Sequence, residues 1–268
     1  MNRNHQKYIF IFLSLAVIAA AVILILVLTR PGHKDAQITE GLEYIRSMES
    51  LDVNAVEKEV NAVRQSLFFE DLDEKIEEDP DYVWTALDQI GTVMMGDSRT
   101  MAFASYGFMD ASRVLAEGGK TIRGIEDHFE ELWAANPSLV VLAYGLNDID
   151  WLCYDPVEYA EIEMEYVDYI QEHLPDARIY IQSILIPRER VEEFYDIPGL
   201  VQKAITWDAQ SMQIYEERGY NTIDVSDLVE ENQDLFGEDG SHFYAPFYPL
   251  LAEKILKQYL KDTMVFND

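Results

Sequence analysis

Short apolar segments recur along the chain beyond Pro80, and each is separated from the next by a longer amphipathic segment. Strands of a parallel sheet have this composition when helices cover both faces, because neither side of the strand meets water. Alternation of such strands with helical segments is typical of a parallel sheet wrapped by helices. The predicted strands cover residues 90–95, 113–116, 139–144, 178–184 and 222–225.

The intervals between these strands have apolar positions at three- and four-residue spacing, which indicates helices with one buried face. The predicted helices cover residues 122–135, 156–174, 200–218 and 246–261. The predicted fold is therefore α/β, a three-layer α/β/α sandwich with a central, mostly parallel five-stranded sheet of flavodoxin-like type over residues 81–268. One long connection, residues 185–199, follows the fourth strand; it is either a lid over a pocket or an irregular surface connection.

A further helix is indicated before this domain, where Val56, Val60, Val63 and Leu67 fall on one helical face. We assign residues 29–80 to a helical stalk or to an N-terminal helical layer on the domain. The apolar face has two interpretations that the sequence leaves open. It either packs on its own domain or forms a homodimer through residues 38–78.

The amino end has the composition of a membrane anchor. Residues 8–28 are apolar apart from Ser14 and carry no charge, and about 20 such residues span a bilayer as a helix. A cleaved signal peptide has a shorter apolar region, followed by small residues at the cleavage site. We therefore predict a cytoplasmic tail over residues 1–7, a single transmembrane anchor over residues 8–28 in the cell membrane, and an extracellular domain beyond it.

Charge narrows the range of partners. The chain carries a net charge of −30, and all of its acidic residues lie beyond residue 30. Nucleic acids are bound through clusters of Lys and Arg, and no such cluster occurs here. The sequence therefore predicts no nucleic-acid partner, and it favours neutral substrates over polyanions, which a strongly acidic domain repels.

The candidate chemistry is that of a serine nucleophile. Ser98 follows the first predicted strand, at a turn that would place its hydroxyl at the edge of the sheet. Serine needs an adjacent base that is oriented by a third group. Asp239 and His242, three residues apart near the C-terminus, supply a carboxylate and an imidazole. The predicted catalytic set is Ser98, His242 as general base and Asp239 as the group that orients it.

These residues occur in blocks that resemble a known family. Over residues 90–260 the blocks are Gly96-Asp97-Ser98, a glycine at Gly118 or Gly119, Gly145-x-Asn147-Asp148 and Asp239-x-x-His242. Their order and spacing resemble the SGNH/GDSL hydrolase family of esterases and lipases. The resemblance implies an oxyanion hole from Ser98, from Gly118 or Gly119, and from Asn147. The family often has Leu after the serine, whereas this chain has Arg99, so the pocket is not implied by the resemblance.

The resulting prediction is a membrane-anchored extracytoplasmic serine esterase that removes short acyl groups, acetyl above all, from carbohydrate, cell-envelope or other small ester substrates. The same nucleophile equally suits an acyltransferase that performs O-acetyl transfer. A non-catalytic envelope scaffold is the third interpretation. Arg99, Arg188 and Arg190 are the predicted substrate contacts.

No cofactor and no metal are predicted. Gly119-Lys120-Thr121 resembles the end of a phosphate-binding loop, but that motif needs a glycine where Val114 stands. Asp148 and Asp150 lack the other ligands of a calcium loop.

Overall fold

The structure is a computed structural model that describes residues 3–28, 41, 53–151 and 155–264. The chain divides into two units, Met1–Arg64 and Gln65–Asp268. The first unit contains helix α1 (Arg3–Leu28), whose apolar side chains between Leu13 and Val27 are exposed. Within the part of the chain that was described, no helix combines the length and the apolarity needed to cross a membrane.

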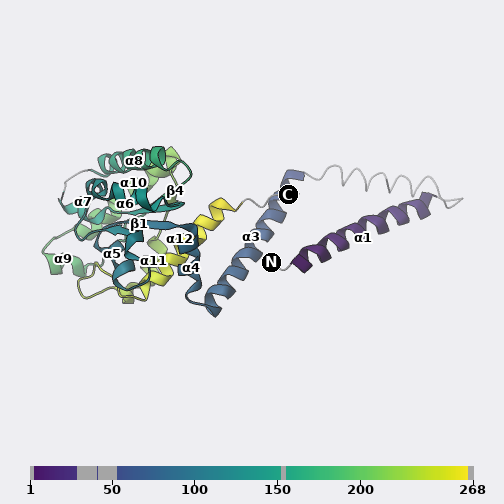
Figure 1. The fold of residues 1–268 in the computed structure, drawn as a ribbon, viewed down its shortest axis with the longest axis horizontal. Coiled ribbons are helices and arrows are strands. Elements are labelled where there is room, and N and C mark those ends of the chain that lie inside the picture. The colour runs from purple at the N-terminus through teal and green to yellow at the C-terminus, as the bar shows by residue number, and fades with distance from the viewer. Residues whose placement is uncertain (1–2, 29–40, 42–52, 152–154, 265–268) are drawn as a thin grey trace. The chain divides into compact units, whose positions relative to one another are not determined.

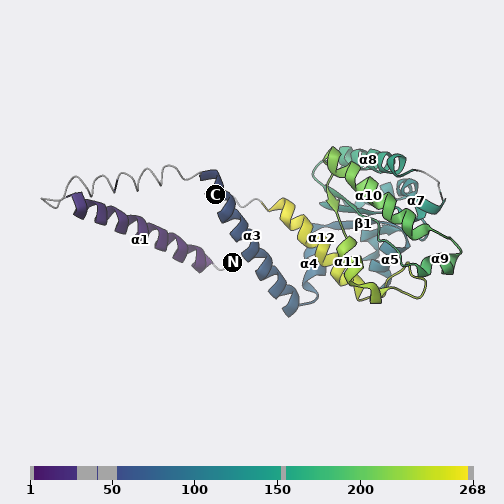
Figure 2. The ribbon, with the colours of Figure 1, turned by 180° about the vertical axis from the view of Figure 1, so that it is seen from behind.

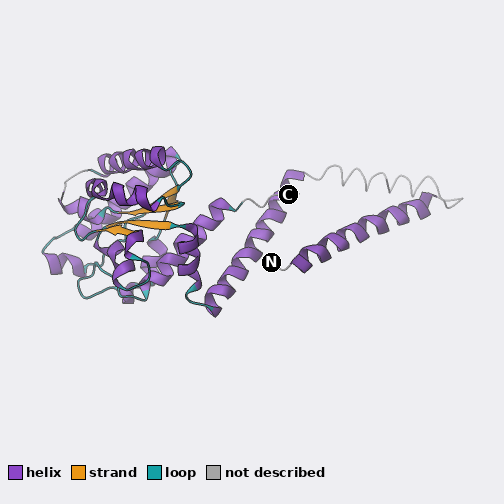
Figure 3. Ribbon diagram, in the orientation of Figure 1, coloured by secondary structure: helices purple, strands orange, loops and turns teal. Residues whose placement is uncertain are grey.

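A five-stranded parallel sheet forms the centre of the second unit (Figure 3). Its strands are β1 (Thr92–Gly96), β2 (Val114–Ala116), β3 (Leu139–Ala143), β4 (Arg178–Gln182) and β5 (Thr222–Ile223). The order is β2-β1-β3-β4-β5, and every neighbouring pair is parallel. The predicted strands and the predicted three-layer fold are confirmed, and the ends of each strand differ from the prediction by two residues at most.

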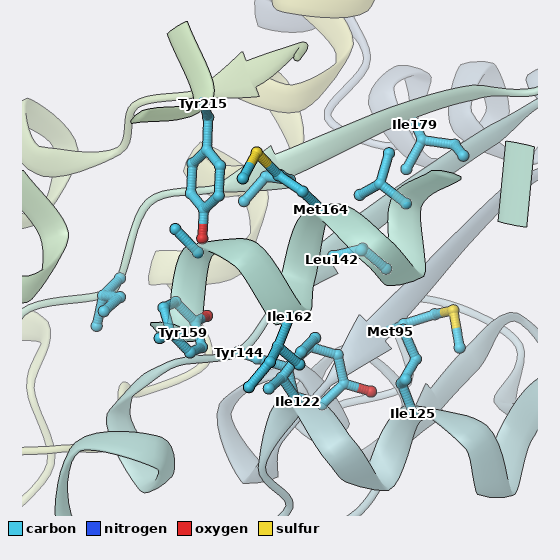
Figure 4. Close-up of a cluster of buried hydrophobic side chains, with 14 of the residues drawn as sticks. Met95, Ile122, Ile125, Leu142, Tyr144, Tyr159, Ile162, Met164, Ile179 and Tyr215 are labelled. Carbon is cyan, nitrogen blue, oxygen red and sulfur yellow. The ribbon is translucent and has the colours of Figure 1, made fainter. Parts of the chain in front are cut away.

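The strands are buried on both faces, as their apolar composition requires. Successive side chains alternate between two cores: Val93 and Met95 of β1 point into one, and Met94 points into the other. Figure 4 shows the first core, where Met95 lies near Ile122 and Ile125, and Leu142 of β3 lies among side chains of the covering helices.

Helices cover both faces of the sheet (Figure 1, and from behind in Figure 2). The first core is closed by α6 (Phe129–Ala135), α7 (Leu146–Trp151), α8 (Pro156–His173) and α10 (Leu200–Arg218). The second core is closed by α4 (Tyr82–Ile90), α5 (Ser98–Ser105), α11 (Ser226–Glu231) and α12 (Phe247–Thr263). Short 3-10 turns lie at η1 (Ala111–Arg113), η2 (Ile122–His128) and η3 (Gln233–Leu235).

Two segments differ in detail from the sequence expectation. The helix predicted over residues 122–135 is η2 followed by α6, because the first turn is 3-10. The connection 185–199 is not wholly irregular, since it contains the helix α9 (Arg190–Tyr195).

Helix α3 (Val53–Glu78) begins in the first unit and ends in the second. Its last turns pack on the domain: Leu72 is buried, and Asp73 pairs with Lys257 of α12 at 2.6 Å. Val63 and Leu67 remain exposed. The domain therefore begins near residue 65 and uses the end of the segment that we assigned to a stalk or helical layer.

Parallel strands all present their carboxyl ends at one edge of the sheet, where ligands bind in open α/β folds. β1 ends just before Asp97, β2 just before Glu117 and β3 just before Tyr144. The segments that carry Ser98, Gly119 and Asn147 therefore start from the same edge.

Candidate active site

Ser98 lies at the junction of β1 and α5. Asp97 caps the helix, with its carboxylate accepting a hydrogen bond from the Arg99 N–H at 2.9 Å, so Ser98 becomes the first helical residue. The preceding Gly96 permits this tight turn, because a Cβ there would lie 2.6 Å from the Ala143 carbonyl oxygen of β3. Ser98 is thus fixed at the N-terminal end of a helix, where backbone N–H groups have no helical partner.

Ser98, His242 and Asp239 lie in one hydrogen-bonded row. Ser98 Oγ is 2.7 Å from His242 Nε2, and His242 Nδ1 is 2.5 Å from Asp239 Oδ2. These separations are within the reach that proton transfer from serine to imidazole requires. The structure therefore brings the predicted nucleophile, base and orienting carboxylate together from positions 144 residues apart in the chain.

Asp239 organises its own turn as well as the imidazole. Its Oδ1 accepts the backbone N–H groups of Ser241 at 2.9 Å and His242 at 3.0 Å. Burial raises the pKa of Asp239, but the hydrogen bonds from the His242 side chain and from these two N–H groups outweigh it and lower the pKa to about 2. Asp239 is therefore charged at neutral pH and holds Nδ1 of His242 as the proton-bearing nitrogen.

The sequence predicts oxyanion donors from three segments, and the structure distinguishes between them. Among the described residues, neither the Ser98 N–H nor the Gly119 N–H has a protein hydrogen-bond partner. Gly119 lines the pocket beside Ser98 and Gly118 does not, which favours Gly119 for this role. Asn147 also lines the pocket, but its Nδ2 donates to Asp97 Oδ2 at 3.2 Å and to the Lys120 carbonyl at 3.0 Å, so both of its N–H groups already have acceptors.

Ser98 and His242 line a pocket of about 570 Å³, a size usual for small-molecule sites. Its apolar lining comes from Leu146 on α7 and from residues in or just after the connection 185–199. These are Val191, Ile197 and Leu200, together with the aromatic Tyr195. The segment that the sequence left as either a lid or a surface connection therefore forms one side of the pocket.

Arg99 occupies a buried position in the turn. Only 3% of it is exposed, and its guanidinium donates to both oxygens of Asp97, at 3.2 and 2.7 Å. The remaining nitrogen donates to the Leu185 carbonyl at 2.8 Å. Arg99 touches the pocket, but its charge is used to tie β1 to the segment after β4.

Arg188 and Arg190 lie outside this pocket and line another one with Pro187 and Glu193. Arg188 donates to the Gln233 carbonyl at 3.1 Å, and Arg190 pairs with Glu193 at 3.0 Å. The structure therefore does not bring these two predicted substrate contacts to Ser98.

Two features of the site escaped sequence reasoning. Asp97 joins Arg99 to Asn147, and an Asp immediately before a helix was a readable capping signal. Tyr195 donates its hydroxyl to Asp239 at 3.0 Å. No motif marks that tyrosine, because it is 44 residues away from Asp239 in the chain.

Known structures share this fold. A GDSL-like lipase from Bacteroides thetaiotaomicron superposes with a TM-score of 0.51 and 16% identity, covering 65% of this chain and 88% of that one. A protein assigned as an acylhydrolase from Bacteroides fragilis gives 0.51 and 19%, covering 64% and 86%. Comparison of the sequence with family models and with curated proteins finds no match. The predicted three-layer α/β/α fold is thus confirmed, and these GDSL-like and acylhydrolase structures share it.

Proposed function

We propose that this protein is a serine esterase that hydrolyses esters of short acyl groups through an acyl-enzyme on Ser98. The observation that carries the proposal is the row of two hydrogen bonds from Ser98 Oγ through His242 to Asp239, at 2.7 and 2.5 Å. The fold shared with GDSL-like lipases and acylhydrolases supports it.

The reaction follows from this geometry. His242 Nε2 takes the Ser98 proton as Oγ attacks the ester carbonyl, and the resulting imidazolium faces the charged Asp239. The N–H groups of Ser98 and Gly119 are the donors nearest to the developing oxyanion. His242 then gives its proton to the leaving alcohol, and an attacking water repeats the sequence to release the acid and restore Ser98.

The substrate class is inferred from the pocket. The pocket of about 570 Å³ combines polar residues around Ser98 with five apolar or aromatic side chains, and we expect this lining to accept a short acyl chain. The acidic surface disfavours polyanions. Acetylated neutral carbohydrates of the cell envelope fit both conditions, and acetyl is the acyl group that we expect to be removed fastest.

Attachment to a membrane is part of the proposal and is supported by the sequence alone. Residues 8–28 carry no charge and are apolar apart from Ser14. We expect the full-length protein to sediment with membranes, and protease added to intact cells to remove the catalytic domain. Protection of that domain would place it on the cytoplasmic side.

Transfer to an acceptor hydroxyl uses the same acyl-enzyme as hydrolysis. Product analysis with an oligosaccharide acceptor present distinguishes them, since an excess of acylated acceptor over free acid identifies a transferase. A scaffold without catalysis predicts neither product.

The central test is hydrolysis of p-nitrophenyl acetate, butyrate and octanoate by the full-length protein. Ser98→Ala should lower kcat by about 10⁴-fold or more, because it removes the nucleophile. Ser105→Ala, at the exposed end of the same helix, is the matched control and should change nothing. Equal turnover by Ser98→Ala and the unmodified protein would disprove the mechanism.

A further inference from the structure

The connection between β4 and α10 is in close backbone contact with the turn that carries Asp239 and His242. The Arg188 N–H donates to the Gly240 carbonyl at 2.8 Å. A Cβ at Gly240 would lie 2.8 Å from the Val191 backbone nitrogen, and its φ of +75° also favours glycine. The position of the catalytic turn is therefore coupled to the position of α9.

Tyr195, in the last turn of α9, continues this coupling to the triad itself. Its hydroxyl donates to Asp239 Oδ2 at 3.0 Å, and that oxygen also accepts the 2.5 Å bond from His242 Nδ1. The other oxygen, Oδ1, is held by two N–H groups of the same turn. Of the donors to this carboxylate, Tyr195 is the one that comes from a different part of the fold.

We propose that Tyr195 is a positioning residue that holds Asp239 against His242 and weakens the electrostatic attraction between the Asp239 carboxylate and the protonated imidazole. This inference rests on the proposed esterase function. The hydroxyl fixes the orientation of Oδ2, and by donating to it takes up part of the negative charge that faces His242. Because Tyr195 also lines the pocket, a substrate seated against α9 touches the residue that orients the triad.

Tyr195 stays protonated, and charged side chains near it have partners other than Asp239. Burial, followed by the hydrogen bond to Asp239, raises the pKa of Tyr195, so it stays a neutral donor through the working pH range. The nearby charges are paired elsewhere: Arg190 with Glu193 at 3.0 Å on α9, and Arg99 with Asp97 at 2.7 Å beside Ser98.

The test is Tyr195→Phe in the full-length protein, which removes the hydroxyl and keeps the ring. We expect kcat/KM to fall roughly tenfold, as for loss of one hydrogen bond to a charged group. The acid limb of its pH profile should move to higher pH by about half a unit, because the undamped carboxylate attracts the protonated imidazole more strongly. The melting temperature should change little, since Tyr195 is 46% exposed.

Tyr220→Phe is the matched control, because Tyr220 makes the same kind of bond to Asp168, at 2.9 Å, away from the site. It should leave kcat/KM and the acid limb unchanged. An unshifted limb in Tyr195→Phe, whether activity is kept or falls together with the melting temperature, would overturn the proposal.

A readout without turnover separates this inference from the proposed function. The low-field proton NMR signal of His242 Nδ1–H should move further downfield in Tyr195→Phe, because Oδ2 becomes a stronger acceptor, and should not move in Tyr220→Phe. Movement of the signal in a protein without Ser98-dependent hydrolysis would support the positioning role and refute the esterase. An unmoved signal in an active esterase would refute the positioning role alone.

Discussion

Asp239 and Glu163 are carboxyl side chains of the same compact unit whose surroundings shift their pKa values in opposite directions. Asp239 contacts the pocket residue His242 and has four hydrogen bonds to its two oxygens, and its pKa falls to about 2. Glu163 is a residue of helix α8, and only 1% of it is exposed. Burial raises the pKa of Glu163 to about 8, against the lowering effect of hydrogen bonds from Tyr215 and Tyr159.

The difference lies in the supply of donors. Tyr215 donates to Glu163 Oε2 at 2.6 Å, while Oε1 has no hydrogen-bond partner among the described residues. Asp148 shows that burial can outweigh donors: burial raises its pKa to about 7, although backbone N–H groups, among them that of Ile122, donate to it and lower the pKa. The surroundings thus lower the pKa of the carboxyl beside His242 and raise the pKa values of the two buried acids, Glu163 and Asp148.

Removing the charge of Asp239 should give the largest effect. In Asp239→Asn the amide can donate to Nδ1 and favour the wrong imidazole tautomer, and such a change typically lowers kcat by about 10⁴-fold. We expect this loss in p-nitrophenyl acetate hydrolysis, with the melting temperature nearly unchanged because the Asn oxygen can still accept the turn N–H groups. Glu238→Gln, the exposed neighbour, should keep full activity; a loss of less than tenfold in Asp239→Asn would contradict the assigned role.

Asp97, a buried carboxylate that is paired with a cation, extends the comparison of Asp239 with Glu163. Asp97 is as buried as Glu163, at 1% exposed, but it pairs with Arg99 at 2.7 Å. Arg99→Leu leaves that carboxylate without its partner, so the free energy of unfolding should fall by about 3–5 kcal/mol. Urea denaturation measures the loss.

The controls for this prediction are a surface pair and a double variant. Arg218 is 3.8 Å from Glu161, with both side chains more than half exposed, and Arg218→Leu should cost less than about 1 kcal/mol. Asp97→Asn combined with Arg99→Leu should recover much of the stability, because no unpaired charge remains. Equal losses for Arg99→Leu and Arg218→Leu would show that burial of the pair does not matter.

The sheet, and the meeting of Ser98, Asp239 and His242, could be predicted from the sequence for a physical reason. Strands covered on both faces must be apolar throughout, and Ser98, Asp239 and His242 each stand in a short local motif. Tyr195 and the pocket lining from Val191 to Leu200 could not be read in this way. Their roles depend on where the chain returns after β4, and no local spacing encodes that contact.

Arg99 is a residue that the sequence identified but to which it assigned a different role. The sequence marks it as a cation beside the nucleophile, which suggested a substrate contact. Its burial depends on the Leu185 carbonyl, 86 residues away, which accepts from it at 2.8 Å. Residue type shows which groups a side chain can bind. Tertiary structure decides whether those groups are already bound within the protein.

The last prediction concerns Glu163 and pH. An acid whose pKa is higher in the folded than in the unfolded protein binds more protons when folded between those two values. Its contribution to stability is fully present below the unfolded value of 4.5 and is lost as pH rises towards about 8. One such group gives a slope of about −1.4 kcal/mol in unfolding free energy per pH unit.

Glu163→Gln imitates the protonated acid at every pH and should remove this slope. We expect the unfolding free energy of the variant to change less between pH 5 and 8 than that of the unmodified protein, with the residual slope set by Asp148 and by Asp208, whose pKa burial raises to about 6. Glu165→Gln, an exposed neighbour on α8, should keep the original slope. If the curves of Glu163→Gln and the unmodified protein run parallel from pH 5 to 8, Glu163 is not a neutral acid in the core, and the contrast with Asp239 fails.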